Sequence, residues 1–225
     1  MTVPVVAIDG PSGAGKGTVA RAVADTLGYH LLDSGAVYRA AALHAARTGA
    51  SLEDEAAVLA ALERFDAHFE PTPDGVRVRF GDEDVTAELR TEATAAGASK
   101  VAVMPGVRAR LLPQQRSFRR PPGLVADGRD MGTVVFPDAT LKVFLTASAE
   151  ERARRRAKQL KEKGIDATMA SLLEDIAARD KRDATRTHSP LVATADYVVV
   201  DSTDVSARGV VARIVAALAD ASAAD

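Results

Sequence analysis

Residues 10–18 read Gly10-Pro11-Ser12-Gly13-Ala14-Gly15-Lys16-Gly17-Thr18. An apolar, β-branched run from Val3 to Ile8 precedes this segment and predicts a buried strand. Apolar residues at helical spacing follow from Gly17 to Leu27, and Gly28 supplies a helix stop. The order strand, glycine loop, helix is typical of a phosphate-binding loop, in which backbone N–H groups and a helix N-terminus face the anion.

Lys16 is the charged residue of this loop, and we expect it to reach the β and γ phosphates of a bound nucleotide as a point charge. The backbone amides from Gly10 to Thr18 would bind the phosphate oxygens. Gly17 stands where Ser or Thr normally holds magnesium, and Thr18 follows one position later. The sequence therefore predicts no direct metal ligand here, and Thr18 would act on Mg²⁺ through water.

The composition excludes several classes of protein. The chain has 225 residues, 47% of them hydrophobic, which is enough for a core in one domain with insertions. Its 29 basic and 31 acidic residues give no overall basic field of the kind that attracts nucleic acid. Cysteine is absent, which excludes disulfides and thiolate chemistry. No apolar run approaches the ~18 residues of a membrane span. We therefore expect a cytoplasmic protein without nucleic-acid or membrane partners. We also expect a monomer, although composition does not determine the oligomeric state.

Three more apolar runs predict further strands, at 123–126, 141–146 and 197–200. Together with the first strand they indicate an α/β fold, with a parallel sheet flanked by helices. Residues 76–80 alternate apolar and basic side chains, which predicts a small antiparallel insertion. Tyr197 places a large ring in the last strand, where we expect it to affect packing only.

Helical patterns fill most of the remaining chain. Ser51 with Asp54 resembles a capping box for a helix that reaches about Phe65. Pro105 starts another helix, which we expect Pro113 to disturb because proline lacks the N–H that a helix interior needs. Eleven of the 29 Lys and Arg residues lie between 150 and 186, in two helical patterns broken at Gly164. Such a hairpin buries little apolar surface, so it should open locally more easily than the sheet.

Several blocks of sequence resemble the bacterial cytidylate kinases, which are nucleoside monophosphate kinases. The likeness begins with the Gly-Lys-Gly-Thr form of the loop and covers nearly the whole chain. The other blocks are Leu31-Leu32-Asp33-Ser34-Gly35-Ala36-Val37-Tyr38-Arg39, Ala98-Ser99-Lys100-Val101, Val107-Arg108, Gln115-Arg116, Ala126-Asp127-Gly128-Arg129-Asp130-Met131-Gly132-Thr133-Val134-Val135-Phe136-Pro137-Asp138-Ala139 and Arg179-Asp180-Lys181-Arg182-Asp183-Ala184-Thr185-Arg186. The block around Arg129 is highly specific to that family.

The resemblance implies transfer of the γ-phosphoryl group of ATP to CMP or dCMP, with Mg²⁺. An acceptor phosphate needs cations that face Lys16, and guanidinium groups grip phosphate oxygens bidentately. The matching family positions are Arg39, Arg129 and Arg186, and the catalytic residues would be Lys16, Arg129 and Arg186. The resemblance also assigns cytosine recognition to Asp130, Ser99 and Arg108, ribose contacts to Arg179 and Asp183, an acceptor-site contact to Ser34, and hydrated magnesium to Asp33.

The resemblance also implies three parts. Residues 1–35, 105–150 and 187–225 would form the ATP-binding core, 36–104 an NMP-binding insertion with the small antiparallel sheet, and 151–186 a basic lid that closes over ATP. The four histidines show no ligand spacing, and phosphoryl transfer to an anionic phosphate needs no general base.

Three alternatives remain. A related kinase could act on UMP, AMP or a small polyol. A GTPase-like switch would need Ser or Thr at position 17 and an Asn-Lys-x-Asp motif, which the sequence lacks. A silent module would bind ATP without turnover. Preference between CMP and dCMP, and tolerance of UMP, stay open.

Overall fold

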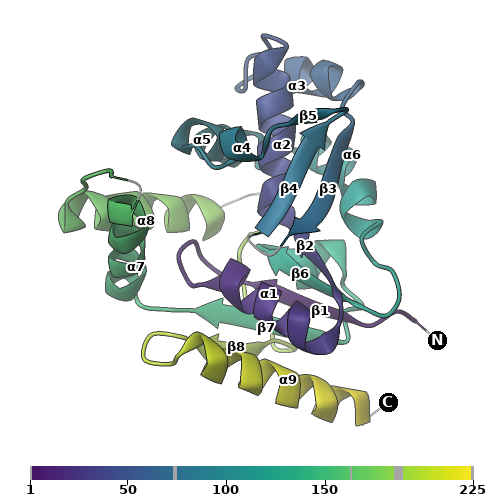
Figure 1. The fold of residues 1–225 in the computed structure, drawn as a ribbon, viewed down its shortest axis with the longest axis vertical. Helices are drawn as coiled ribbons and strands as arrows, with labels where there is room; N and C mark the ends of the chain where they lie inside the picture. The colour runs from purple at the N-terminus through teal and green to yellow at the C-terminus, as the bar shows by residue number, and fades with distance from the viewer. Residues whose placement is uncertain (1, 73–74, 163, 185–189, 224–225) are drawn as a thin grey trace. The chain divides into compact units, whose positions relative to one another are not determined.

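The main sheet has five strands, in the order β2 (His30–Asp33), β6 (Leu124–Gly128), β1 (Val5–Asp9), β7 (Leu141–Thr146) and β8 (Val198–Asp201) (Figure 1). This structure is a computed structural model, and it describes residues 2–72, 75–162, 164–184 and 190–223. Central strand β1 pairs in parallel with β6 and β7, and β7 pairs in parallel with β8. The predicted α/β fold with a parallel sheet flanked by helices is confirmed.

The chain divides into two units, residues 1–31 with 119–225 and residues 32–118. The first unit contains β1 (Val5–Asp9), α1 (Lys16–Leu27), β6 (Leu124–Gly128), the π-helix η1 (Met131–Val135), β7 (Leu141–Thr146), α7 (Ala149–Glu162), α8 (Met169–Ala184), β8 (Val198–Asp201) and α9 (Ala207–Ala223). Strand β2 (His30–Asp33) crosses the boundary. The second unit contains α2 (Ser34–Arg47), α3 (Glu55–Leu62), β3 (Ala67–Thr72), β4 (Gly75–Phe80), β5 (Glu83–Asp84), α4 (Thr86–Leu89), α5 (Glu92–Val101) and α6 (Pro105–Arg116).

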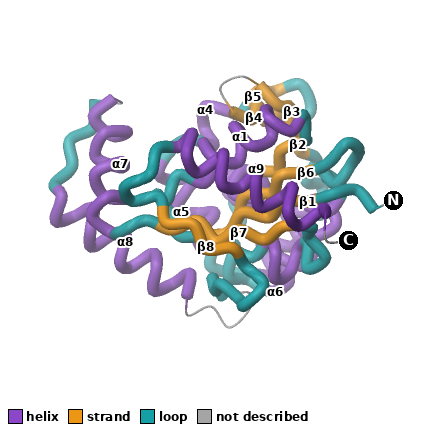
Figure 2. Tube along the Cα trace, turned by 90° about the horizontal axis from the view of Figure 1, so that it is seen from below, coloured by secondary structure: helices purple, strands orange, loops and turns teal. Residues whose placement is uncertain are grey.

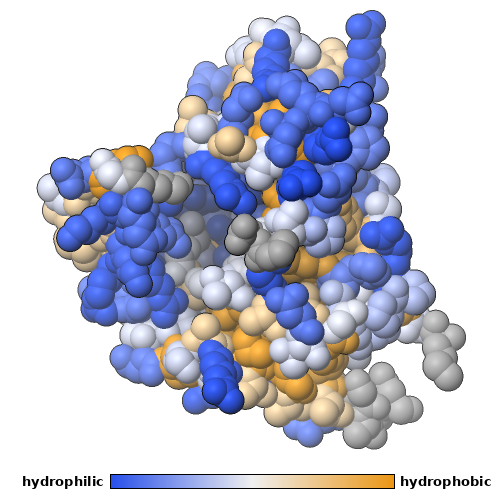
Figure 3. Space-filling model, in the orientation of Figure 1, coloured by the Kyte–Doolittle hydropathy of each residue, from blue (hydrophilic) through white to orange (hydrophobic). Residues whose placement is uncertain are grey.

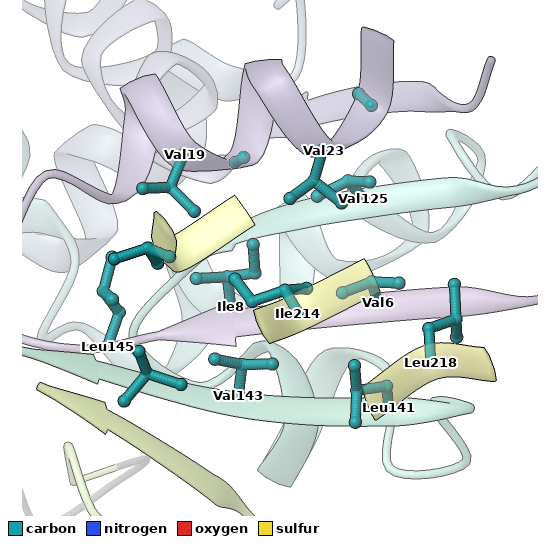
Figure 4. Close-up of a cluster of buried hydrophobic side chains, with 14 of the residues drawn as sticks. Val6, Ile8, Val19, Val23, Val125, Leu141, Val143, Leu145, Ile214 and Leu218 are labelled. Atoms are coloured by element: carbon teal, nitrogen blue, oxygen red, sulfur yellow. The ribbon is translucent and has the colours of Figure 1, made fainter. Parts of the chain in front are cut away.

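The core of the first unit covers one face of the parallel sheet. Every residue of β1 is buried, as its uninterrupted apolar run predicts. Side chains of α1 and α9 pack onto the sheet: Val23 lies beside Val125, and Ile214 lies between Val6 and Ile8 (Figure 4). In Figure 2 the strands are orange, and α1 and α9 are purple like all the helices. Full burial of a Val or Ile side chain contributes about 1.5 to 3 kcal/mol, so this cluster anchors the edge of the sheet from which the glycine loop leaves.

The second unit combines a small antiparallel sheet with helices. Its strands lie in the order β3-β4-β5, and Phe69 of β3 is opposite Val78 of β4. The alternation at 76–80 therefore correctly predicted an antiparallel strand, because Val78 is buried and Arg77 is exposed. A separate apolar cluster lies under this sheet and contains Ala40, Ala67, Val78, Val85 and Leu89.

The predicted capping box at Ser51 is wrong. Helix α3 begins at Glu55, and its N-cap is Asp54, whose carboxylate accepts the N–H groups of Ala56 and Ala57 at 2.9 and 3.3 Å. Aspartate alone can satisfy the first free N–H groups of a helix, so a Ser51 cap is unnecessary. The helix ends at Leu62 rather than near Phe65.

Pro113 was expected to disturb the helix that begins at Pro105, but the helix continues through it. Helix α6 continues to Arg116, with Val107, Leu111 and Gln115 buried along it. Proline removes one backbone hydrogen bond, and burial of this face on both sides of Pro113 offsets that loss. Arg108 precedes Pro113 on this helix, and its N–H donates to the carbonyl of Met104 at 3.0 Å.

Helices α7 and α8 form the predicted hairpin, separated by a stretch that includes Gly164 in the left-handed region. Its apolar cluster is small and contains Ala153, Leu160, Leu172 and Ile176. In the space-filling view the exposed face of this hairpin is largely hydrophilic (Figure 3). Among the described residues, no helix combines the length and apolar character of a membrane span.

Candidate active site

The glycine loop connects β1 to α1 at the carboxyl edge of the parallel sheet (Figure 1). A Cβ on Gly10 would lie 2.0 Å from the carbonyl oxygen of Leu145, so no larger residue fits. Gly15 has φ +89° and stands at the N-cap of α1. Within the described chain, no side chain caps this helix. Its first N–H groups therefore suit an anion held by the loop.

Lys16 lies almost completely buried inside the loop, and its Nζ donates a hydrogen bond to the carbonyl of Pro11 at 2.9 Å. Burial, followed by the nearby charge of Arg129, lowers the pKa of Lys16 to about 7. Asp127 and Asp9 act in the opposite direction, and Arg179 adds to the lowering. Lys16 thus lies buried beside two arginines, and a polyphosphate bound there would raise its pKa again.

Arg129 and Asp183 bring two elements of the first unit together. Arg129 Nε donates to Asp183 Oδ2 at 2.9 Å, and Arg129 Nη1 donates to the carbonyl of Gly128. Asp183 is buried in α8, the helix that also carries Arg179. Lys16, Arg129, Arg179 and Asp183 therefore lie near one another beside the loop. Arg186 lies outside the described residues.

Asp127 is a site residue that the sequence analysis did not select. It lies at the carboxyl end of β6, and its Oδ2 would be 3.6 Å from a Cβ placed on Gly17. The carboxylate thus faces the point where other phosphate loops have a hydroxyl. The available signal was its place at the end of a parallel strand, where ligands of open α/β sheets bind.

Two arginines of α7 were also missed, and both reach the loop. Arg152 donates to the carbonyl of Ser12 at 3.2 Å and forms a two-pronged ion pair with Asp180 of α8, at 2.9 and 2.6 Å. Arg155 donates to the carbonyls of Ala14 at 3.1 Å and of Ser202 at 2.6 Å. Because the hairpin is rich in arginine, its sequence could not indicate which arginines face the loop.

Tyr197 does more than fill space, so the expectation that it affects packing only is wrong. It comes directly before β8, and its hydroxyl donates to Oδ2 of the buried Asp9 at 2.7 Å. The ring also lies edge-on to Phe144. A contact across 188 residues has no local signature in the sequence.

The second unit holds Ser34, Arg39, Ser99 and Arg108, whereas Asp130 lies in the first unit, directly before η1. Ser34 is the first residue of α2 and is buried. Asp33 caps α2 through the N–H of Ala36, and its second oxygen pairs with Arg39 at 2.9 Å. Ser99 donates to a carbonyl of its own helix. Arg108 donates to the carbonyl of Ala102, with its guanidinium 5.9 Å from the ring centre of Tyr38.

Comparisons with known proteins identify the family to which the chain belongs. The family model described as cytidylate kinase matches residues 6–220. The chain belongs to the cytidylate kinase family. It is 58% identical to a cytidylate kinase of Methylococcus capsulatus over 91% of this chain and 92% of that one. It is 54% identical to a cytidylate kinase of Pseudomonas paraeruginosa over 95% of this chain and 94% of the relative.

A comparison with solved structures supports the fold alone. An uncharacterized protein from Eubacterium ventriosum superimposes with a TM-score of 0.51 and 14% sequence identity, over 97% of this chain and 99% of that protein. The resemblance found in the sequence blocks is thus confirmed by relatives that match over nearly the full length of the chain.

Proposed function

We propose that this chain transfers the γ-phosphoryl group of ATP to CMP or dCMP, giving ADP and CDP or dCDP. The observation that carries the proposal is the gathering of Lys16, Arg129 and Arg179 beside a glycine loop in a cytidylate kinase family member. An acceptor phosphate oxygen attacks the γ phosphorus, and the bond from that phosphorus to the β–γ bridging oxygen breaks. The transferred group spreads charge over its oxygens, so catalysis depends on alignment and neutralisation.

Each predicted residue has a role in this proposal. The amides of 10–18 hold the donor phosphates, and Lys16 neutralises the β and γ groups. The guanidinium groups are proposed to clamp the phosphate of the acceptor, at Arg39, Arg129 and Arg186. Base and ribose contacts are proposed for Ser34, Ser99, Arg108, Asp130, Arg179 and Asp183.

Magnesium is proposed as the companion of ATP, where it would neutralise phosphate oxygens. Mg²⁺ usually takes one or two carboxylates together with substrate phosphates and water. Asp127 suits that pattern because its carboxylate lies against Gly17 at the start of α1. In the part of the chain that the structure describes, no three His, Cys, Asp or Glu side chains lie together as a metal cluster. Thr18 and Asp33 are proposed to act through water.

We also propose the three-part organisation, with a core (1–35, 105–150 and 187–225), an NMP-binding insertion (36–104) and a lid (151–186). Closure of the lid would exclude water that otherwise hydrolyses the γ phosphate. The enzyme is proposed to act as a cytoplasmic monomer whose partners are nucleotides rather than nucleic acid or membrane. Sedimentation of the purified chain tests the monomer directly, since a dimer would double the mass.

The test of function is release of ADP, measured with CMP, dCMP, UMP, AMP or no acceptor. We expect rapid release with CMP and dCMP, slower release with UMP, and almost none without an acceptor. Equal release in all five reactions would indicate an ATPase, and no release in any would indicate a silent ATP-binding module.

A further inference from the structure

Asp9 is a buried carboxylate to which the proposed mechanism gives no role. It is the last residue of β1, fully buried, and directly precedes Gly10 of the phosphate loop. Its Oδ1 accepts the N–H of Met131 at 2.9 Å, and its Oδ2 accepts the N–H of Gly132 at 2.9 Å and the hydroxyl of Tyr197 at 2.7 Å. Three donors thus satisfy a carboxylate that water does not reach.

The two N–H groups bound by Asp9 begin the π-helix η1, whose N-cap is Asp130. An aspartate at an N-cap normally uses its own carboxylate to accept such N–H groups. Across the described residues, η1 has no side-chain cap from Asp130. Asp9, which lies in β1, accepts these N–H groups instead, so capping of η1 does not require the Asp130 carboxylate. One-turn π-helices often occur at functional sites, and this one directly follows the proposed cytosine-reading residue.

Tyr197 fixes the orientation of the Asp9 carboxylate. Burial and the charge of Asp9 raise the pKa of Tyr197 well above its ordinary value, so the hydroxyl remains a donor throughout the working pH range. The ring lies so close to η1 that a Cβ on Gly132 would be 2.5 Å from its hydroxyl oxygen. Glycine at position 132 therefore lets the ring reach Asp9.

We propose that Asp9 and Tyr197 are positioning residues that set the direction of Asp130 and thereby the selectivity for cytosine over uracil. This inference rests on the proposed function, in which Asp130 accepts the exocyclic amine of CMP. Uracil has a carbonyl where cytosine has that amine, so a fixed carboxylate binds one base and repels the other. A displaced carboxylate would lose both effects.

The experiment compares Tyr197→Phe with the wild-type chain for kcat/KM on CMP and on UMP. Removal of the hydroxyl deprives Asp9 of one donor, and we expect the ratio of the two kcat/KM values to fall about tenfold. Tyr29→Phe is the matched control, because Tyr29 packs against Gly123 elsewhere in the same unit. Its ratio should equal that of the wild type. If Tyr197→Phe has the same CMP to UMP ratio of kcat/KM as the wild type, the inference is overturned.

A double-mutant cycle separates positioning from general destabilisation. In an Asp130→Ala background, Tyr197→Phe should change the CMP to UMP ratio no further, because the residue that it positions is gone. An equal fall in both backgrounds would contradict the inference. If Tyr197→Phe does not fold, Gly132→Ala is the second variant, because its Cβ would push the Tyr197 hydroxyl aside. It should lower the CMP to UMP ratio of kcat/KM in the same way. An unchanged ratio in Gly132→Ala would overturn the inference.

Failure of this inference is distinct from failure of the proposed function. A wild-type chain that does not phosphorylate CMP would overturn the function itself. A wild-type chain that phosphorylates CMP, combined with unchanged selectivity in the variants, would overturn only the role of Asp9 and Tyr197.

Discussion

The phosphate loop and the α7–α8 hairpin belong to the same unit, yet they are built on different physical principles. The loop takes its shape from backbone sterics, since Gly10 lies against a strand of the buried sheet. The hairpin has a small apolar cluster and is attached to the loop by charged side chains, chiefly Arg152 and Arg155. Steric constraints on the loop leave a recognisable motif in the sequence. Hydrogen bonds from two arginine side chains to loop carbonyls can be exchanged, so the hairpin is the part suited to move.

The largest effect is expected at Arg186, which belongs to the proposed lid. An arginine that neutralises the transferred phosphoryl group contributes ~10³ to 10⁵ in rate, about 4 to 7 kcal/mol. Arg186→Ala should lower kcat within that range at saturating CMP. Arg182→Ala is the control, because Arg182 is exposed on α8 and should change kcat less than about twofold. A loss below tenfold for Arg186→Ala would remove this residue from the phosphate clamp.

A second prediction concerns the steric half of the comparison. Gly10→Ala would drive a Cβ into the carbonyl of Leu145, so we expect a loss of about 3 kcal/mol in the free energy of unfolding. Gly28→Ala is the matched control, since Gly28 is left-handed at φ +66° but has open space around it. That substitution should cost about 1 kcal/mol. Urea unfolding measures both, and equal losses would refute the steric account of the loop.

The comparison also explains which parts of the molecule the sequence could predict. Strand β7 matches its predicted bounds, and α1 ends at Gly28 as expected, because burial patterns and glycine stops are local signals. Pro113 within α6 was predicted wrongly because tertiary burial outweighs the loss of one hydrogen bond. The contact of Tyr197 with Asp9 joins segments 188 residues apart, and no local pattern encodes it. For Asp127 the sequence offered only its place at the end of a predicted strand.

A smaller effect is expected where the hairpin is attached to the loop. Arg152→Lys keeps the charge but loses the two-pronged pair with Asp180, which should raise KM for ATP about tenfold because the Ser12 segment is less firmly held. Arg154→Lys is the control, since that side chain is 71% exposed, compared with 7% for Arg152. Steady-state kinetics measure KM for ATP in both variants. Equal values would show that the Arg152–Asp180 pair does not support the loop.

The smallest predicted effect is a proton taken up with ATP. Burial holds the pKa of Lys16 at about 7, so most of this side chain is neutral at pH 8, and the phosphates should raise its pKa. The lowered pKa also affects the free energy of unfolding. Between pH 7 and 10.5 the unfolded chain holds a proton on Lys16 that the folded chain without nucleotide has lost, so the free energy of unfolding should rise with pH over this range. Calorimetry with Mg-ATP at pH 8, in two buffers of different ionisation enthalpy, should show uptake of close to one proton. A binding enthalpy independent of buffer would contradict this.

The most direct test of the whole account follows the γ phosphate itself. ATP labelled in the γ position is incubated with CMP and either the wild-type chain or Lys16→Met. We predict that the wild-type chain moves the label into CDP and that Lys16→Met does so at least ~10²-fold more slowly. Label that appears in inorganic phosphate rather than in CDP, or an equal rate in the variant, would contradict phosphoryl transfer at this loop.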